Sequence, residues 1–155
     1  TCASAIKAVK DLKLNYITIH ISSGLKALKV AKKFAGKTKL IGVTILTSLD
    51  NKSLKEIGFD KNVKQLVVDQ AKLANKAKLD AIVCSPHEIK LVRKVFKREI
   101  ITPGIRFRED KKIDQKRVMT PKQAFKNGAT SIVIGRSLTE GNLSKNIQKL
   151  IKELK

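Results

Sequence analysis

The apolar residues of this chain follow two alternating spacings along nearly its whole length. Short runs that are rich in Ile, Val and Leu predict strands buried on both faces, as in a parallel sheet. These runs lie at residues 16–21, 40–46, 79–84, 99–102 and 131–134. Around them, apolar residues recur every three or four positions, which is the spacing of amphipathic helices. The helices are predicted at residues 3–12, 25–35, 51–57, 61–76, 87–96, 121–127 and 143–153.

The order of these elements predicts an α/β protein with a parallel sheet. Each predicted strand is preceded or followed by a helix, and repeated βα units form parallel sheets with right-handed crossovers. Two architectures fit this pattern, a doubly wound sheet and part of a barrel. The chain has no Gly-x-Gly-x-x-Gly after a strand and no Walker lysine loop, which removes the main support for a nucleotide-binding doubly wound fold. Residues 106–119 lack periodicity and are predicted to form a long loop.

Turn-forming and polar residues gather where the predicted strands end. They are Ser22-Ser23, Thr47-Ser48, Ser85-Pro86, Pro103-Gly104 and Gly135-Arg136. In a (β/α)8 barrel, this is the face that carries the site. Two of these ends carry an arginine, Arg106 and Arg136, and a planar guanidinium matches the oxygens of a phosphate. From the residues alone we therefore predict part of a phosphate-binding α/β barrel.

Length and cysteine usage narrow the class of protein. The 155 residues suit one domain, 1–155, but a complete (β/α)8 barrel takes about 250 residues. The chain opens on Thr1 rather than Met, so we expect the carboxyl-terminal portion of a barrel, an incomplete barrel of about five βα units. No apolar run approaches the ~20 residues of a membrane span, and no membrane partner is expected. Cys2 and Cys84 form no CxxC pair, which favours a reducing, cytoplasmic compartment.

The net charge of +21 raises the possibility of a nucleic-acid partner. The lysines, however, are spread over nearly every predicted helix and do not cluster in one arm. Aromatic residues make up only 4% of the chain, with no Trp, so there is no platform on which bases could stack. A solvated, lysine-rich surface is the favoured interpretation, and its charge can also attract an anionic substrate.

The motifs of the last third resemble those of orotidine 5'-phosphate decarboxylase, a (β/α)8-barrel enzyme of pyrimidine biosynthesis. The most specific match is Thr102-Pro103-Gly104-Ile105-Arg106 followed by Asp114-Gln115-Lys116-Arg117. Three shorter segments are similar to those after the family's strands four, six and eight: His20-Ile21-Ser22-Ser23-Gly24, Val83-Cys84-Ser85 and Ile134-Gly135-Arg136. The resemblance identifies the chain as strands four to eight of that barrel. It implies the substrate orotidine 5'-monophosphate (OMP), the product uridine 5'-monophosphate (UMP), and neither metal nor cofactor.

The resemblance also implies which residues hold the phosphate end of the nucleotide. Arg136 would bind the phosphate, assisted by the amide of Gly135. Arg106 would support the phosphate end, and Gln115 would lie on a loop that closes over phosphate and pyrimidine. Thr47 would bind near the ribose or the phosphate.

Three further matching residues are assigned to the base and to the subunit interface. Ser85 would contact the pyrimidine edge, and Pro103 would line the base pocket. Thr1 matches a threonine that reaches the neighbouring subunit's site, so a homodimer is expected for the full-length protein.

The sequence departs from the family pattern in two respects. Phe107 and Arg108 follow Arg106, where the family usually has Pro and then Gly. The Asp-x-Lys-x-x-Asp motif, which supplies the proton donor and the charges around the reacting carbon, does not occur in the 155 residues. No catalytic residue is therefore assigned in this chain, which alone is expected to bind the nucleotide weakly without turning it over.

Other interpretations remain open at this stage. A related sugar-phosphate barrel of the hexulose-phosphate synthase type is one, although Asp114-Gln115 argues against it, and a basic nucleic-acid-binding protein is another. Thr47 and Ser85 could simply cap the following helices. His20 is best interpreted as structural, and no metal-ligand spacing joins it to His87. Asp80 flanks the third strand with no partner that the sequence identifies.

Overall fold

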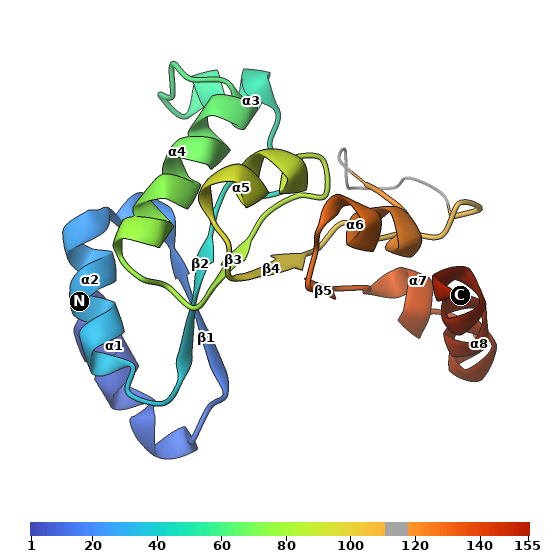
Figure 1. Cartoon of the computed structure of the whole chain (residues 1–155), viewed down its shortest axis with the longest axis horizontal. Helices are drawn as coiled ribbons and strands as arrows, with labels where there is room; N and C mark the ends of the chain where they lie inside the picture. The colour runs from blue at the N-terminus through green and yellow to red at the C-terminus, as the bar shows by residue number, and fades with distance from the viewer. Residues whose placement is uncertain (111–117) are drawn as a thin grey trace.

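Five parallel strands form a single sheet in the computed structural model, which describes residues 1–110 and 118–155. The strands are β1 (Tyr16–His20), β2 (Lys39–Val43), β3 (Ala81–Val83), β4 (Glu99–Thr102) and β5 (Ser131–Ile132). Their order across the sheet is their order along the chain (Figure 1). The pairings are in simple register, for example Ile41 beside Ala81 and Ala81 beside Glu99.

Eight α-helices within the described residues connect or flank these strands. They are α1 (Cys2–Ala8), α2 (Leu25–Phe34), α3 (Asn51–Glu56), α4 (Val63–Lys76), α5 (Ile89–Val95), α6 (Pro121–Asn127), α7 (Arg136–Thr139) and α8 (Leu143–Leu154). Two short 3₁₀ turns, η1 (Lys10–Leu12) and η2 (Ile21–Ser23), follow α1 and β1. Several helices begin at side-chain caps that satisfy an otherwise unpaired backbone N–H. Asn62 and Gln65 form a reciprocal capping box at α4, and Thr120 caps α6 ahead of Pro121.

The strand order decides between the two architectures that the sequence left open. A doubly wound sheet reverses its strand order near the middle, which places helices on both faces. Here each strand pairs with the next one in sequence, so right-handed crossovers place all the connecting helices on one face. Figure 1 shows α2, α4, α5 and α6 arranged around the outer side of the strands. The predicted incomplete (β/α)8 barrel is therefore confirmed.

The two faces of the sheet differ in burial as this architecture requires. Side chains that point toward the helices, such as Leu40, Ile82 and Ile100, are fully buried. On β1, alternate residues are exposed, and Tyr16 is 45% exposed on the opposite, concave face. The core thus lies between the strands and the helices. On the concave face, Ile41 and Ala81 are also buried, whereas Tyr16 is exposed.

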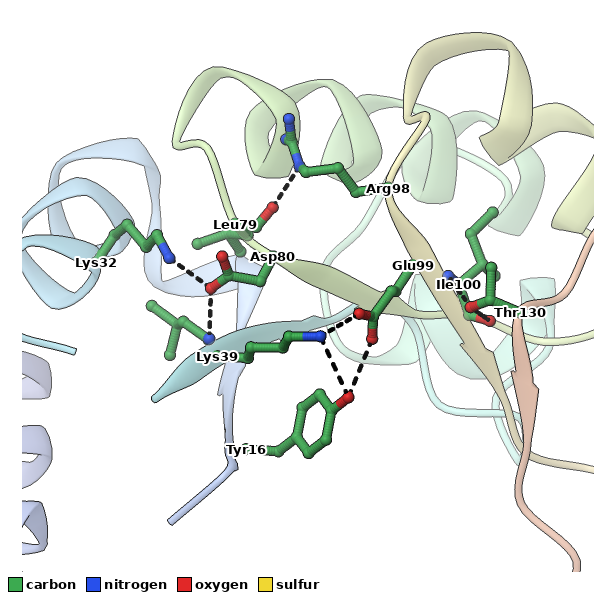
Figure 2. Close-up of polar contacts among 10 residues, drawn as sticks. Tyr16, Lys32, Lys39, Leu79, Asp80, Arg98, Glu99, Ile100 and Thr130 are labelled. Atoms are coloured by element: carbon green, nitrogen blue, oxygen red, sulfur yellow. Dashed lines mark hydrogen bonds and ion pairs between the residues drawn. The ribbon is translucent and has the colours of Figure 1, made fainter. Parts of the chain in front are cut away.

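A hydrogen-bonded cluster spans the concave face at the amino ends of the strands (Figure 2). The Lys39 ammonium donates to the Glu99 carboxylate, and the Tyr16 hydroxyl donates to the same carboxylate at 3.3 Å. Lys39 is on β2 and Glu99 on β4. Glu99 is in register with Ala81 on β3, and Ala81 is in register with Ile41, two residues after Lys39. The Lys39–Glu99 contact therefore joins next-nearest strands across this face of the sheet.

The Lys39–Glu99 contact also has a pH signature. The hydrogen bond to Glu99 raises the pKa of Lys39 above its usual 10.5. A raised folded-state pKa contributes stability below the unfolded value, and that contribution is lost as the pH rises through the folded value. The raised pKa of Lys39 therefore contributes stability at neutral pH, and this contribution is lost as the pH rises above about 10.5.

The structure supplies the partner that the sequence did not identify for Asp80. Its Oδ2 accepts hydrogen bonds from the Lys32 ammonium at 2.5 Å and from the backbone N–H of Leu40 at 2.7 Å. Nearby, Arg98 Nε donates to the carbonyl oxygen of Leu79 at 2.6 Å (Figure 2). These contacts tie α2 and the turn before β3 to the sheet, so the role of Asp80 is structural.

Some predicted boundaries were wrong. The apolar run at 40–46 ends as a strand at Val43, because its partner β3 ends at Val83. The helix predicted at 3–12 ends at Ala8 and continues only as the 3₁₀ turn η1. The predicted loop 106–119 is closed at its base by a bridge between Ile105 and Met119.

Two threonines on and beside β4 give a matched test of buried hydrogen bonding. Thr102 is fully buried, and its Oγ1 has no hydrogen-bond partner among the described residues. Thr130 Oγ1 accepts from the N–H of Ile100 and donates to the carbonyl oxygen of the same residue, both at 2.9 Å. A buried hydroxyl without a hydrogen-bond partner, as in Thr102, lowers the stability of the folded state. Removal of the Thr130 hydroxyl would instead leave the buried N–H of Ile100 without its acceptor.

We expect Thr102→Val to raise the free energy of unfolding by about 1 kcal/mol and Thr130→Val to lower it by a similar amount. Urea unfolding of both variants beside the wild-type chain measures the two changes. If Thr102→Val destabilises the chain as much as Thr130→Val does, the Thr102 hydroxyl has a partner and the argument fails.

Candidate functional site

Two arginines from successive strand ends line one pocket. Arg106 follows the Pro103-Gly104 turn after β4, and Arg136 begins α7 just after Gly135, in the segment that follows β5. Together with five other residues they line an open cavity of about 380 Å³. The other lining residues are Glu109, Asp110, Ser137, Glu140 and Asn146. Loops after the last two strands, joined to a short extra helix, form the usual phosphate site of (β/α)8 barrels.

The Arg106 side chain is held toward α7. Its Nη1 donates to Ser137 Oγ at 3.1 Å, which links the loop after β4 to the helix after β5. The backbone on either side is fixed too: Met119 N–H donates to the carbonyl oxygen of Gly104, and Arg106 N–H donates to that of Met119, each at 3.1 Å. Gly104 has a positive φ of +78°, which is unfavourable for residues that carry a Cβ. The turn therefore requires glycine, and it directs Arg106 into the pocket.

A tight turn follows Arg106. The N–H of Phe107 donates to Asp110 Oδ2 at 2.9 Å, and the N–H of Asp110 donates to the carbonyl oxygen of Phe107 at 3.2 Å. Phe107 is buried, although it stands where the resembled family usually has proline. The Phe107 side chain is thus accommodated in the packed interior of the protein. Gln115, predicted to lie on the closing loop, is outside the described residues.

Ser85 and Pro103, assigned to the pyrimidine, follow the adjacent strands β3 and β4. Ser85 is buried, and its Oγ accepts from the N–H of His87 at 3.3 Å. The His87 ring donates from Nε2 to the carbonyl oxygen of Val118 at 3.2 Å, which fixes its tautomer. Ser85 is therefore held by a hydrogen bond in the loop after β3, next in the sheet to the strand that precedes Pro103. Its contact with a base stays a prediction.

Thr47 and Thr1 are not brought into the arginine pocket. Thr47 is half-buried in the loop after β2. It does not cap α3, because Asp50 accepts the N–H of Ser53 and is the cap there. Thr1 is exposed at the start of α1 and lines a separate cavity with Ser23 and Lys26. Their assignments to the nucleotide and to a neighbouring subunit's site stay predictions.

Sequence reasoning missed several residues of the pocket. Ser137, Glu109 and Asp110 follow the two arginines at short spacing, and that proximity is the signal that could have identified them. Asn146 is on α8, and no motif or spacing in the sequence connects it with Arg106. Its side-chain amide donates to the carbonyl oxygens of Leu138 and Glu140, at 3.0 and 2.8 Å.

The described part of the chain contains neither a cluster of metal ligands nor a membrane-spanning helix. Residues 1–110 and 118–155 contain no group of three or more His, Cys, Asp or Glu side chains that could hold a metal ion. None of the helices in these ranges is long and apolar enough to span a membrane.

Comparisons with known proteins agree on one family. The model of the orotidine 5'-phosphate decarboxylase / HUMPS family matches residues 1–149. An orotidine 5'-phosphate decarboxylase of Wolbachia sp. subsp. Brugia malayi is 45% identical over 157 residues, covering 97% of this chain and 68% of the relative. The enzyme of that name from Coxiella burnetii is 42% identical over 164 residues, covering 100% of this chain and 70% of the relative.

A solved structure gives the same result in three dimensions. The crystal structure of orotidine 5'-phosphate decarboxylase from Lactobacillus acidophilus superposes with a TM-score of 0.82 at 28% identity. The match covers 99% of this chain and 69% of that one. The chain therefore spans about 70% of the length of these relatives.

Proposed function

Since the chain belongs to the orotidine 5'-phosphate decarboxylase / HUMPS family, we propose that its pocket holds the phosphate of the nucleotide in the conversion of OMP to UMP and carbon dioxide. The observation that carries this proposal is the convergence of Arg106 and Arg136 on one cavity at the carboxyl ends of the strands. Guanidinium groups bind phosphate through charge-assisted, often bidentate, hydrogen bonds.

The rest of the nucleotide would extend from this pocket across the carboxyl ends of the neighbouring strands. Ser85 and Pro103 follow the two strands that precede β5 in the sheet, and this position supports their proposed contact with the pyrimidine. Gripping the phosphate at a distance from the reacting carbon is useful because remote binding energy can stabilise the transition state. In this proposal the chain supplies binding and orientation.

In this proposal the chemical step depends on a motif that does not occur in the 155 residues. Loss of carbon dioxide leaves a carbanion-like centre that must be stabilised and then protonated, and the Asp-x-Lys-x-x-Asp motif assigned to that task is not in the sequence. We therefore propose that the 155-residue chain by itself binds the nucleotide but does not decarboxylate it. A homodimer, with Thr1 reaching the neighbouring site, is part of the same proposal for the full-length protein.

Two other functions are less well supported. A sugar-phosphate barrel of the hexulose-phosphate synthase type shares the phosphate site, but the curated relatives described above carry the decarboxylase name. Nucleic-acid binding has only the net charge of +21 in its favour. Ligand binding can separate all three.

We expect UMP to raise the midpoint of thermal unfolding in a concentration-dependent way, because a ligand that binds only the folded state stabilises it. Uridine, which has no phosphate, should have a much smaller effect at equal concentration. Ribose 5-phosphate serves as the probe for a sugar-phosphate site, and an arbitrary DNA duplex at several salt concentrations serves as the probe for nucleic acid.

Stabilisation by DNA alone, with a steep dependence on salt, would contradict the proposal, and so would equal effects of ribose 5-phosphate and UMP. The same preparation is assayed for release of carbon dioxide from OMP. Turnover by the purified 155-residue chain would show that it carries a proton donor that the motif analysis did not identify.

A further inference from the structure

The arginine pocket is not simply cationic. Two guanidinium groups, from Arg106 and Arg136, share its lining with three carboxylates, from Glu109, Asp110 and Glu140. Among the described residues of the lining, these side chains sum to one net negative charge. A phosphate carries up to two negative charges, so it would be repelled unless a further positive charge compensates one of the carboxylates.

The compensating charge comes from α8. The Lys149 ammonium forms an ion pair with Glu109 Oε2, and it also lies 4.3 Å from the centre of the Phe107 ring. The hydrogen bond from Lys149 lowers the pKa of Glu109 below its usual 4.5, so this carboxylate is ionised at neutral pH. Lys149 is therefore positioned by two contacts with the turn that carries Arg106.

The other carboxylate on this turn already has a local role. Asp110 Oδ2 accepts the N–H of Phe107, so its charge is partly satisfied by the backbone. On the opposite side of the pocket, Asn146 of α8 donates to the carbonyl oxygens of Leu138 and Glu140. One helix thus contacts both sides of the pocket, through Asn146 on one side and Lys149 on the other.

We propose that Lys149 is a positioning residue for phosphate binding, which acts by pairing with Glu109. The pair draws the Glu109 carboxylate toward α8 and neutralises it, which brings the charge around the pocket from negative to balanced. Without Lys149, the Glu109 carboxylate is available to compete with phosphate for Arg106 and Arg136. This inference rests on the proposed function, because it takes the pocket to be the phosphate site.

Phe107 contributes to the positions of both Lys149 and Asp110. Phe107 stands where the family usually has proline, and a proline has neither an aromatic ring nor an N–H. The Phe107 ring provides the face against which the ammonium of Lys149 lies, and its N–H binds Asp110. A cation held over an aromatic ring and paired with a carboxylate is more restricted than one paired at the surface alone.

The test measures binding of UMP, and of inorganic phosphate, to purified variants by calorimetric titration at low ionic strength. We expect Lys149→Met to weaken the binding of both ligands by roughly three- to fivefold, which is the scale of one partly exposed charge pair. The double variant with Glu109→Gln should return to near the wild-type affinity, because the uncompensated carboxylate is gone. Lys149→Arg should retain wild-type binding.

Lys145→Met is the matched control, since it removes the same charge from the same helix one turn away. Lys149 and Glu109 are 42% and 71% exposed at their side chains, so the unliganded variants should unfold at the wild-type temperature. A purely structural role would lower that temperature and would not be rescued by Glu109→Gln.

The proposal is wrong if Lys149→Met binds like wild type, if Lys145→Met weakens binding equally, or if Glu109→Gln fails to rescue. Failure of the wild-type chain to bind either UMP or phosphate would overturn the proposed function and this inference together. Wild-type binding with no effect at Lys149 would overturn this inference alone.

Discussion

Replacing Arg136 by alanine is expected to lower the affinity for UMP by about a hundredfold. Arg136 lines the pocket at the first position of α7. Hydrogen bonds to a charged group contribute about 1.5–3 kcal/mol, and a hundredfold change in dissociation constant corresponds to about 2.7 kcal/mol. The effect is large because removal of Arg136 also takes one positive charge from a lining that contains carboxylates.

Calorimetric titration with UMP measures this loss. Arg136→Lys keeps the charge but loses the planar fork, so it should bind with intermediate affinity. Arg108→Ala is the matched control: Arg108 is exposed two residues beyond Arg106 and does not line the pocket. Equal losses for Arg108→Ala and Arg136→Ala would mean that general charge, and not this pocket, attracts the nucleotide.

Substituting Gly42 by alanine is expected to destabilise the fold by about 2–3 kcal/mol. Gly42 is in the middle of β2, and a Cβ there would lie 2.7 Å from Leu79 Cδ1 and 2.8 Å from Ile21 Cγ1. Both neighbours are fully buried, so neither can move aside into solvent. The inserted methyl group therefore forces strain on the core between sheet and helices, where packing is already dense.

Thermal unfolding should show this as a midpoint lower by roughly 5–10 °C for a chain of this size. A double-mutant cycle isolates the cause, since Leu79→Ala removes the closest atom. Gly42→Ala should cost less in the Leu79→Ala background than in the wild-type chain. Additive costs would show that the steric contact with Leu79 is not the source of the strain.

The strength of the local signals decided how much of the fold could be predicted. The strand at 99–102 and the helix at 121–127 were predicted to the residue, because Pro103-Gly104, Pro121 and Gly128 mark their ends. The end of β2 was not predictable from its own apolar run, since it depends on where β3 stops. The order of the strands in the sheet likewise follows only from the strand pairing in the structure, because the sequence pattern is also compatible with a doubly wound sheet.

Part of the candidate site was likewise predictable from the sequence, and part was not. Arg106 and Arg136 were predicted from glycine and arginine at strand ends, and the structure brings both to one cavity. The contact of Lys149 with Glu109 joins residues forty positions apart on an exposed surface. Lysines occur on most helix faces of this chain, so no pattern distinguishes this one before the fold is known.

The agreement between strand order and chain order has a consequence for how the fold is assembled. Each strand pairs only with the strands before and after it in sequence, so every sheet contact closes a loop of one βα unit. Such short loops carry a small entropic cost of closure. During synthesis from the amino end, each new unit can add to the sheet as soon as it leaves the ribosome. At each stage, the edges of the described sheet that stay open to intermolecular pairing are the outer edge of β1 and the edge of the newest strand.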